Sequence, residues 1–290
     1  MQTIGCDFSS SPSKRKPIVV AISHEFSNEI SQWPATNMRV QLSKLERLET
    51  LDAFSQWLIS HTDWVGGFDL PFGLPRELVE TLGWPTDWAE CMRYYAGLSR
   101  EQIRAAFKAF CDARPVGDKF AHRAADLPAG SSPSMKWVNP PVAYMLHAGV
   151  PRLMAAGVDF PGLKSGDTQR VALEAYPGLL AREVIGNRSY KSDDKTKQTP
   201  ERLIARKDII TALENGQTRL AQNTGLRLKL SNAQRDTLAG DASGDSLDAV
   251  LCMLQAAWAQ AQHAQGKPRY GLPKCDPLEG WIVTCSNGLA

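Results

Sequence analysis

One amphipathic segment near the C-terminal end of the chain, residues 244–258, places the strongest constraint on the fold. Its apolar residues recur at the spacing of one buried helix face: Leu247, Val250, Leu251, Leu254 and Trp258. Asp245 and Asp248 lie three residues apart in the first turn, so both carboxylates share a face beside this apolar stripe. The segment therefore predicts a buried helix that begins with two acids. Acids at this position also bind free N–H groups and favour the helix dipole, so a purely structural role stays open.

Length and composition predict an ordinary globular protein. A chain of 290 residues, of which 43% are hydrophobic and 22% are charged, can bury a full core. The net charge of +2 does not indicate a strongly basic domain, so any contact with nucleic acid must be local. The six cysteines lack metal-binding spacing, and we expect them to be reduced. Because the chain has no signal-peptide pattern and no run of about 18 apolar residues, we expect a soluble, cytoplasmic protein without membrane contact.

The patterns along the chain predict an α/β fold. Residues 1–70 follow the order β-β-β-α-β, with strands over 3–8, 17–23, 37–42 and 64–70 and a helix over 45–58. A further strand and two helices are expected over residues 171–176, 177–184 and 200–214, whereas residues 221–240 give no clear pattern. Residues 71–167 are rich in Pro and Gly and contain short helical patterns. We expect a single domain over residues 1–290, in which residues 71–167 form a large, mostly helical insertion or cap.

Two predicted strands end in the same Gly-x-Asp pattern, at residues 5–7 and 67–69. In a strand, residues two apart point to the same face, so each glycine leaves space beneath an aspartate. If the strands are adjacent and parallel, Asp7 and Asp69 both reach the carboxyl edge of the sheet, where open α/β folds bind ligands. Each aspartate could instead be an ordinary turn residue at a strand end.

Three further acids could reach the same edge of the sheet. Asp245 and Asp248 begin a helix that should pack on the sheet, and Glu174 ends a later strand. Glu174 could also be a partly buried acid that pairs with an arginine. Clustered carboxylates repel one another by a few kcal/mol per pair at about 4 Å, so a cation is needed to neutralise them. We therefore predict a catalytic site made of Asp7, Asp69, Asp245, Asp248 and Glu174, in which the four aspartates bind metal ions.

Mg²⁺ or Mn²⁺ fits such a cluster, because hard cations prefer oxygen ligands. Two ions would activate a water molecule and stabilise the leaving oxygen in the hydrolysis of a phosphodiester. Three lysines in polar loops, Lys14, Lys16 and Lys191, are candidate contacts to the substrate phosphates, although each loop could simply be solvated. The expected partner is DNA or RNA.

These acids lie in segments that resemble the RNase H-like superfamily, and most closely a family of predicted RNase H-like nucleases (domain of unknown function, family 429). In chain order the similar segments are Gly5-Cys-Asp-Phe, Phe68-Asp-Leu-Pro-Phe-Gly, Leu173-Glu-Ala-Tyr-Pro, Ser189-Tyr-Lys-Ser, Gly244-Asp-Ser-Leu-Asp-Ala-Val-Leu-Cys and Glu279-Gly-Trp-Ile. The later half is also similar to the RuvC-type resolvases. The resemblance implies a five-stranded mixed sheet flanked by helices, and a nuclease activity.

The resemblance also implies a role for each aspartate. Asp7 would be the metal ligand on the first strand, Asp69 would take the place of the fourth-strand acid, and Asp245 with Asp248 would supply the ligands of the last helix. The fourth-strand acid of the resolvases is usually Glu, so the shorter Asp69 would have to lie closer to the metal. Residues 71–167 have no counterpart in the resolvases, so their preference for branched DNA is not carried over.

Two other functions are compatible with the sequence. The segment Asp7-Phe-Ser-Ser-Ser is weakly similar to the first phosphate loop of actin-like and sugar kinases, which favours an ATP-dependent phosphotransferase, but we find no second Gly-rich phosphate loop. A non-catalytic nucleic-acid-binding protein is the third possibility. Two groups of side chains could extend the site, although tryptophans more often build a core: Trp84, Trp88 and Trp137, which could stack on bases, and His122, Arg123 and Asp126, which could lie over the carboxylates.

Overall fold

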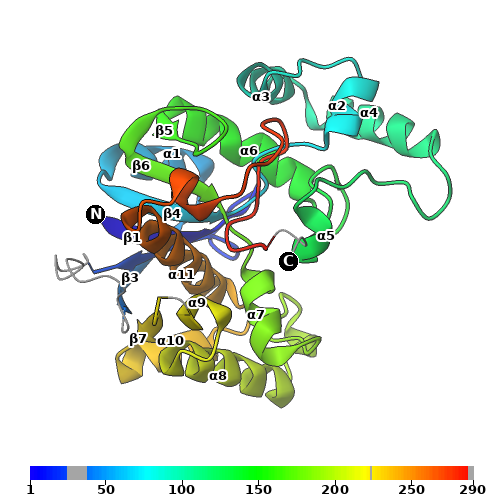
Figure 1. The fold of residues 1–290 in the computed structure, drawn as a ribbon. Coiled ribbons are helices and arrows are strands. Elements are labelled where there is room, and N and C mark those ends of the chain that lie inside the picture. Colours follow the sequence, from blue (N-terminus) through cyan, green and yellow to red (C-terminus); the bar gives the residue numbers. More distant parts are fainter. Residues whose placement is uncertain (25–37, 223, 287–290) are drawn as a thin grey trace.

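The strand β1 (Gln2–Asp7) lies in the middle of a seven-stranded mixed sheet in the computed structural model, which describes residues 1–24, 38–222 and 224–286 (Figure 1). Its neighbours are β4 (Trp64–Asp69), which is parallel to it, and β2 (Ile18–Ser23), which is antiparallel. The outer strands are β6 (Asp167–Glu174) and β5 (Val158–Asp159) beyond β4, and β3 (Arg39–Leu48) and β7 (Arg227–Lys229) beyond β2. The sheet is open, because β5 and β7 form its two edges.

The expected α/β class, with a mixed sheet flanked by helices, is confirmed, but the sheet has seven strands where five were expected. The short strands β5 and β7, of two and three residues, form its edges. Segments of this length are too short to show the alternation that identifies a strand in a sequence. Residues 221–240, which gave no clear pattern, contain β7 and the helix α10 (Asn232–Gly240).

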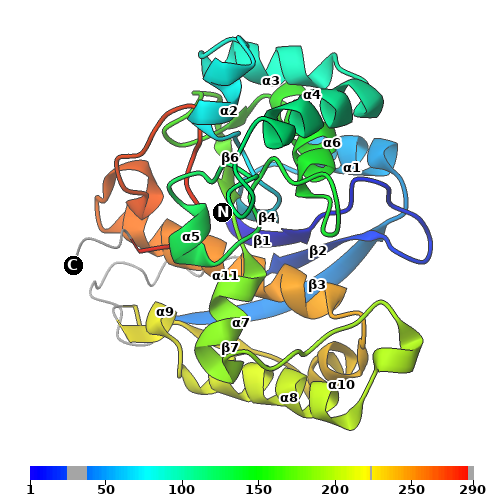
Figure 2. The same ribbon diagram turned by 90° about the vertical axis from the view of Figure 1, so that its right-hand side faces the viewer.

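Helices cover both faces of the sheet (Figure 2). One face carries α1 (Leu51–Ser60) and α6 (Val142–Ala155), and the other carries α7 (Pro177–Ile185), α8 (Pro200–Asn215), α10 and α11 (Asp245–Ala264). In β2, Ile18, Val20 and Ile22 pack toward the first face, whereas Val19 and Ala21 pack toward the second. Burial on both faces explains why β2 is a continuous apolar run. Within the described residues, no helix is both long and apolar enough to cross a bilayer.

The helix predicted over residues 244–258 is present as α11, which packs directly on β1 and β4. A Cβ atom on Gly5 would lie 2.0 Å from the carbonyl oxygen of Ala249, and one on Gly67 would lie 2.4 Å from that of Cys252. The glycine of each Gly-x-Asp pattern therefore lets the helix backbone touch the strand. The space that the sequence predicted beneath each aspartate is filled by α11.

The predicted helix over residues 45–58 starts too early. Residues up to Leu48 belong to β3, and α1 begins at Leu51, after the side chain of Thr50 accepts a hydrogen bond from the N–H of Ala53. Pairing with β2 along residues 42–48 outweighs the helical spacing of the apolar side chains. The third strand was predicted over 37–42; residue 37 lies outside the described residues, and β3 begins at Arg39.

Slightly fewer than half of residues 71–167 are in helices, where a mostly helical insertion was expected, and the segment shares a hydrophobic core with the sheet. Besides α6 it contains α2 (Arg76–Thr81), α3 (Trp88–Ala96), α4 (Arg100–Asp112) and α5 (Asp126–Ala129). Trp84 and Trp88 are buried in this core, and the Nε1 of Trp88 donates to the carbonyl oxygen of Phe72 at 2.7 Å. Trp137 packs against the same core. Trp84 and Trp88 are therefore core residues without a free face for a base, whereas Trp137 is partly buried.

Candidate functional site

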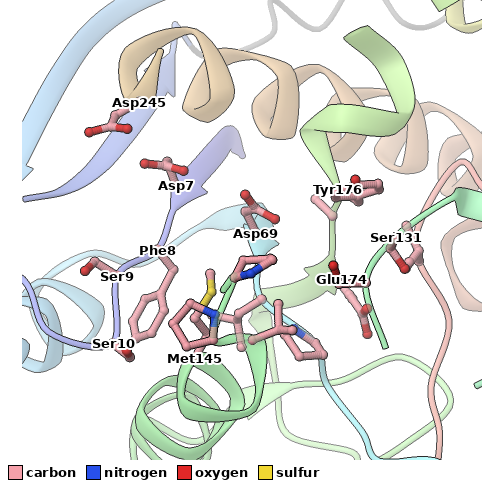
Figure 3. Close-up of a pocket in the computed structure, with 18 of the residues that line it drawn as sticks. Asp7, Phe8, Ser9, Ser10, Asp69, Ser131, Met145, Glu174, Tyr176 and Asp245 are labelled. Atoms are coloured by element: carbon pink, nitrogen blue, oxygen red, sulfur yellow. The ribbon is translucent and has the colours of Figure 1, made fainter. Parts of the chain in front are cut away.

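Asp7 and Asp69 lie at the same edge of the sheet. They end the adjacent parallel strands β1 and β4 and are register partners, as are Gly5 and Gly67. Asp7 is 9% exposed and Asp69 is partly buried. The arrangement that the Gly-x-Asp patterns predicted is therefore present, and both carboxylates face one cavity (Figure 3).

The helix α11 brings two more carboxylates to this edge. Asp245 and Asp248 are 3% and 0% exposed, and neither side chain caps the helix. Asp248 accepts a hydrogen bond of 2.5 Å from the hydroxyl of Tyr190 and forms an ion pair with Lys191. A carboxylate oxygen of Asp245 lies 3.3 Å from the Nζ of Lys16. The first turn is instead stabilised by Asp241, whose carboxylate accepts from the N–H of Ser246 at 3.0 Å.

The four aspartates form one electrostatic group. Burial, followed by the charges of Asp248 and Asp245, raises the pKa of Asp7 well above its ordinary value. Burial also raises the pKa of Asp69 to about 7, although Lys191 opposes this change. Burial alone would lower the pKa of Lys191, but Asp248, Tyr190 and Asp7 raise it well above its ordinary value. If all four aspartates were ionised, their negative charge would exceed the positive charge of the two lysines, and the raised pKa values of Asp7 and Asp69 favour their protonated forms instead.

Asp7, Asp69 and Asp245 line one wall of a cavity of about 470 Å³, whereas Asp248 is fully buried and does not line it. Lys16 and Lys191 also line it, and the insertion supplies the opposite wall from Asn139, Pro140, Pro141, Val142 and Met145. Figure 3 shows Asp7, Asp69 and Asp245 along one side and Phe8 with Met145 along the other. The insertion thus encloses the edge of the sheet where the acids meet.

Glu174 lies in the same cavity wall, but its carboxylate belongs to a buried ionic cluster. It accepts from Arg123 at 2.6 Å and from the N–H of Phe72 at 2.8 Å, and Arg123 also pairs with Asp126 at 2.8 Å. Arg123 is 2% exposed and Asp126 is fully buried. These contacts match the alternative interpretation of Glu174 as a buried acid that pairs with an arginine. Arg123 and Asp126 do lie beside the site, and they connect the insertion to β6.

The three candidate phosphate-binding lysines differ in position. Lys16 and Lys191 line the cavity, and Lys16 also pairs with Asp193 at 2.6 Å. Lys14 is exposed in the loop between β1 and β2 and is not among the residues that line the cavity.

Two residues that contact the charged groups of the site were not predicted. Tyr190 donates to Asp248, and Asp193 lines the cavity and pairs with Lys16. Both lie within two residues of Lys191, so the position of Lys191 in a polar turn was the available signal.

The donor set of the four aspartates fits a hard cation, because it consists of carboxylate oxygens. In this arrangement Lys191 and Lys16 bind two of those carboxylates. Among the described residues, no group of three or more acidic, histidine or cysteine side chains is arranged to hold a metal ion. Cation binding therefore requires these side chains to exchange partners.

Comparisons with family models, with curated proteins and with solved structures give no match to this chain.

Proposed function

We propose that this chain is a metal-dependent phosphodiesterase that acts as a nuclease on DNA or RNA. One observation carries the proposal: two parallel strands and a helix N-terminus direct three carboxylates, Asp7, Asp69 and Asp245, into one cavity with two lysine ammonium groups, while the fully buried Asp248 pairs with one of those lysines. Burying several like charges in a cleft is unfavourable for folding and is typical of active sites. The capping role that the sequence left open for Asp245 and Asp248 does not apply, because neither side chain caps α11.

Asp7, Asp69, Asp245 and Asp248 would hold Mg²⁺ or Mn²⁺. Such a cation, when bound, would activate a water molecule and neutralise charge on a phosphoryl oxygen. Lys191 and Lys16 would then give up their contacts with Asp248 and Asp245. The ammonium group of Lys191 would be free to bind phosphate oxygens, whereas Lys16 would keep its contact with Asp193. Asp7, Asp245 and Asp248 are buried, which strengthens each of these electrostatic contacts.

The resemblance to RNase H-like nucleases remains part of this proposal. The mixed sheet flanked by helices is compatible with this resemblance, although it has seven strands where the resemblance implies five. Asp7, Asp69 and the two acids of α11 also occur at the strand ends and helix start that the resemblance assigns to metal ligands. A cytoplasmic location is compatible with the cysteines, since all six are free thiols and five of them are buried.

An ATP-dependent phosphotransferase is the second candidate. Ser9 and Ser10 follow Asp7 and line the cavity, which is where a phosphate loop would lie. This function requires ATP turnover and does not require nucleic acid. A non-catalytic nucleic-acid-binding protein would bind nucleic acid without turning over either substrate.

The direct test compares cleavage of labelled single-stranded, duplex and branched DNA and RNA by the native protein with Mg²⁺ or Mn²⁺. Asp7→Asn should abolish cleavage, whereas Asp236→Asn is a matched control on the exposed face of α10 and should cleave like the native protein. Cleavage that persists in Asp7→Asn would refute the assignment. ATP hydrolysis without nucleic-acid cleavage would favour the phosphotransferase.

A further inference from the structure

The cavity has an apolar wall directly across from its carboxylates. Pro141 is exposed, and Val142 and Met145, on the first turns of α6, are partly exposed. Phe8 and Leu70 complete this wall from the strand ends. An apolar surface beside a polar reaction centre is typical of pockets that bind the flat apolar part of a ligand while polar groups fix its charged part.

The carboxylates are too enclosed to meet a rigid duplex. Asp248, Asp245 and Asp7 are 0%, 3% and 9% exposed, and the insertion residues lie over them. In a duplex, each phosphodiester is held on the outside of a stiff rod, with paired bases and the second strand beside it. A flexible single strand can turn one nucleotide into the cavity, whereas a duplex must first unpair it at a cost of a few kcal/mol.

A second cavity, of about 340 Å³, adjoins the first and provides a path for the rest of the strand. The two cavities share Asp69, Tyr176 and Lys191 as lining residues. Arg182 and Arg188 line the second cavity along α7 and the turn that follows it, and Arg188 pairs with Asp208 at 2.8 Å. Arg182 donates to the carbonyl oxygen of Ala129 and to the hydroxyl of Tyr176, and neither group neutralises its positive charge. Positive side chains along a path are typical of single-strand binding.

We infer, on the basis of the proposed phosphodiesterase function, that the substrate is single-stranded nucleic acid. One unpaired nucleotide enters the first cavity with its base against Val142 and Met145 and its phosphate at the carboxylates. The neighbouring phosphates follow the second cavity past Arg182. The insertion therefore selects unpaired strands over duplexes.

The test measures fluorescence anisotropy of a labelled oligonucleotide of about 12 nucleotides, single-stranded or as a duplex, with native protein in Ca²⁺, a hard cation that carboxylates also bind. Because a duplex must unpair, the single strand should bind at least about tenfold more tightly. Equal or tighter binding of the duplex would overturn the inference. The same holds if only free mononucleotides bind.

Substitutions at Met145 and Arg182 test where the single strand binds. Met145→Gln should weaken single-strand binding about fivefold, because the base loses an apolar contact, whereas Ile59→Gln, an exposed site on α1, serves as the matched control. Arg182→Gln should reduce the slope of log affinity against log salt by about one, and Arg182→Lys should retain it. Single-strand binding that none of these substitutions changes would place the strand elsewhere and overturn the proposal.

The outcome separates this inference from the proposed function. If Mn²⁺ supports cleavage of duplexes alone, the phosphodiesterase stands and the single-strand inference fails. If the protein binds single strands with the expected preference but Mn²⁺ neither stabilises it nor supports cleavage, the phosphodiesterase fails and the single-strand site stands. Circular dichroism of each variant verifies that it is folded.

Discussion

Asp7 on β1 and Asp69 on β4 are register partners on adjacent parallel strands. The glycines two residues before them let α11 contact both strands, so the same contact brings Asp245 and Asp248 to the two strand ends. Burial, together with repulsion from neighbouring carboxylates, raises the pKa of Asp7 and Asp69, which means that the fold keeps a cluster that opposes its own stability. Such a cluster is expected at a functional site rather than in a structural core.

Asp69→Asn should stabilise the protein at pH 8 in the absence of divalent cations. The folded state holds the Asp69 proton up to a pH of about 7, while the unfolded chain releases it near about 3.9. The native protein therefore loses stability as pH rises between these values, and the amide, which does not titrate, avoids that loss. The variant's advantage should grow up to about pH 7 and reach roughly 2–4 °C in Tm. Thermal unfolding in EDTA at pH 5 and pH 8 measures it; an advantage that is the same at both values contradicts the raised pKa.

Lys191→Met should destabilise the protein by about 1–2 kcal/mol without divalent cations, a value reduced because the lysine side chain is 41% exposed. The substitution leaves the carboxylate of Asp248 buried with the hydroxyl of Tyr190 as its partner. Mn²⁺ should reduce the difference in stability between the native protein and Lys191→Met, because a bound cation replaces the missing ammonium group. Thermal unfolding with and without Mn²⁺ measures this effect, with the exposed Lys195→Met as control. Equal stabilisation of the native protein and Lys191→Met by Mn²⁺ would show that the cation does not bind at Asp248.

Glu174→Gln should reduce stability more than it reduces cleavage. The buried Arg123 would keep Asp126 but lose its second carboxylate, so we expect a loss of about 2–3 kcal/mol in the free energy of unfolding. Urea denaturation, together with cleavage assays well below the unfolding transition, separates the two effects. The control is Glu49→Gln, on an exposed residue. A fully folded Glu174→Gln variant without activity would instead make Glu174 a catalytic residue.

Gly5→Ala should destabilise the protein by about 2 kcal/mol or more and abolish cleavage. The added Cβ would lie 2.0 Å from the carbonyl oxygen of Ala249 and 2.1 Å from the nitrogen of Met253, so α11 must move away from β1. That movement separates Asp245 and Asp248 from Asp7. Gly240→Ala is the matched control, because a Cβ there meets no atom within 4 Å. Urea denaturation and a cleavage assay check both variants; native stability in Gly5→Ala would mean that the contact with α11 is looser than described.

The sequence by itself determined the α/β class, the buried helix α11 and the two strands that end in aspartate. These features depend on local spacing: apolar residues recur along one helix face, and a glycine lies two residues before each strand-end acid. The convergence of Asp7 and Asp69 required one assumption, that their strands are parallel neighbours. The structure meets that assumption.

The tertiary structure decided what the local pattern leaves open. Residues up to Leu48 are a strand because β2 lies beside them, and the short strands β5 and β7 exist only through pairing with β6 and β3. The tertiary structure also determines the partners of the charged groups. Glu174 pairs with Arg123, 51 residues away in the sequence, and Asp248 pairs with Lys191, 57 residues away. Backbone periodicity specifies which face of an element is buried, but the contact between two distant side chains depends on how all the elements pack.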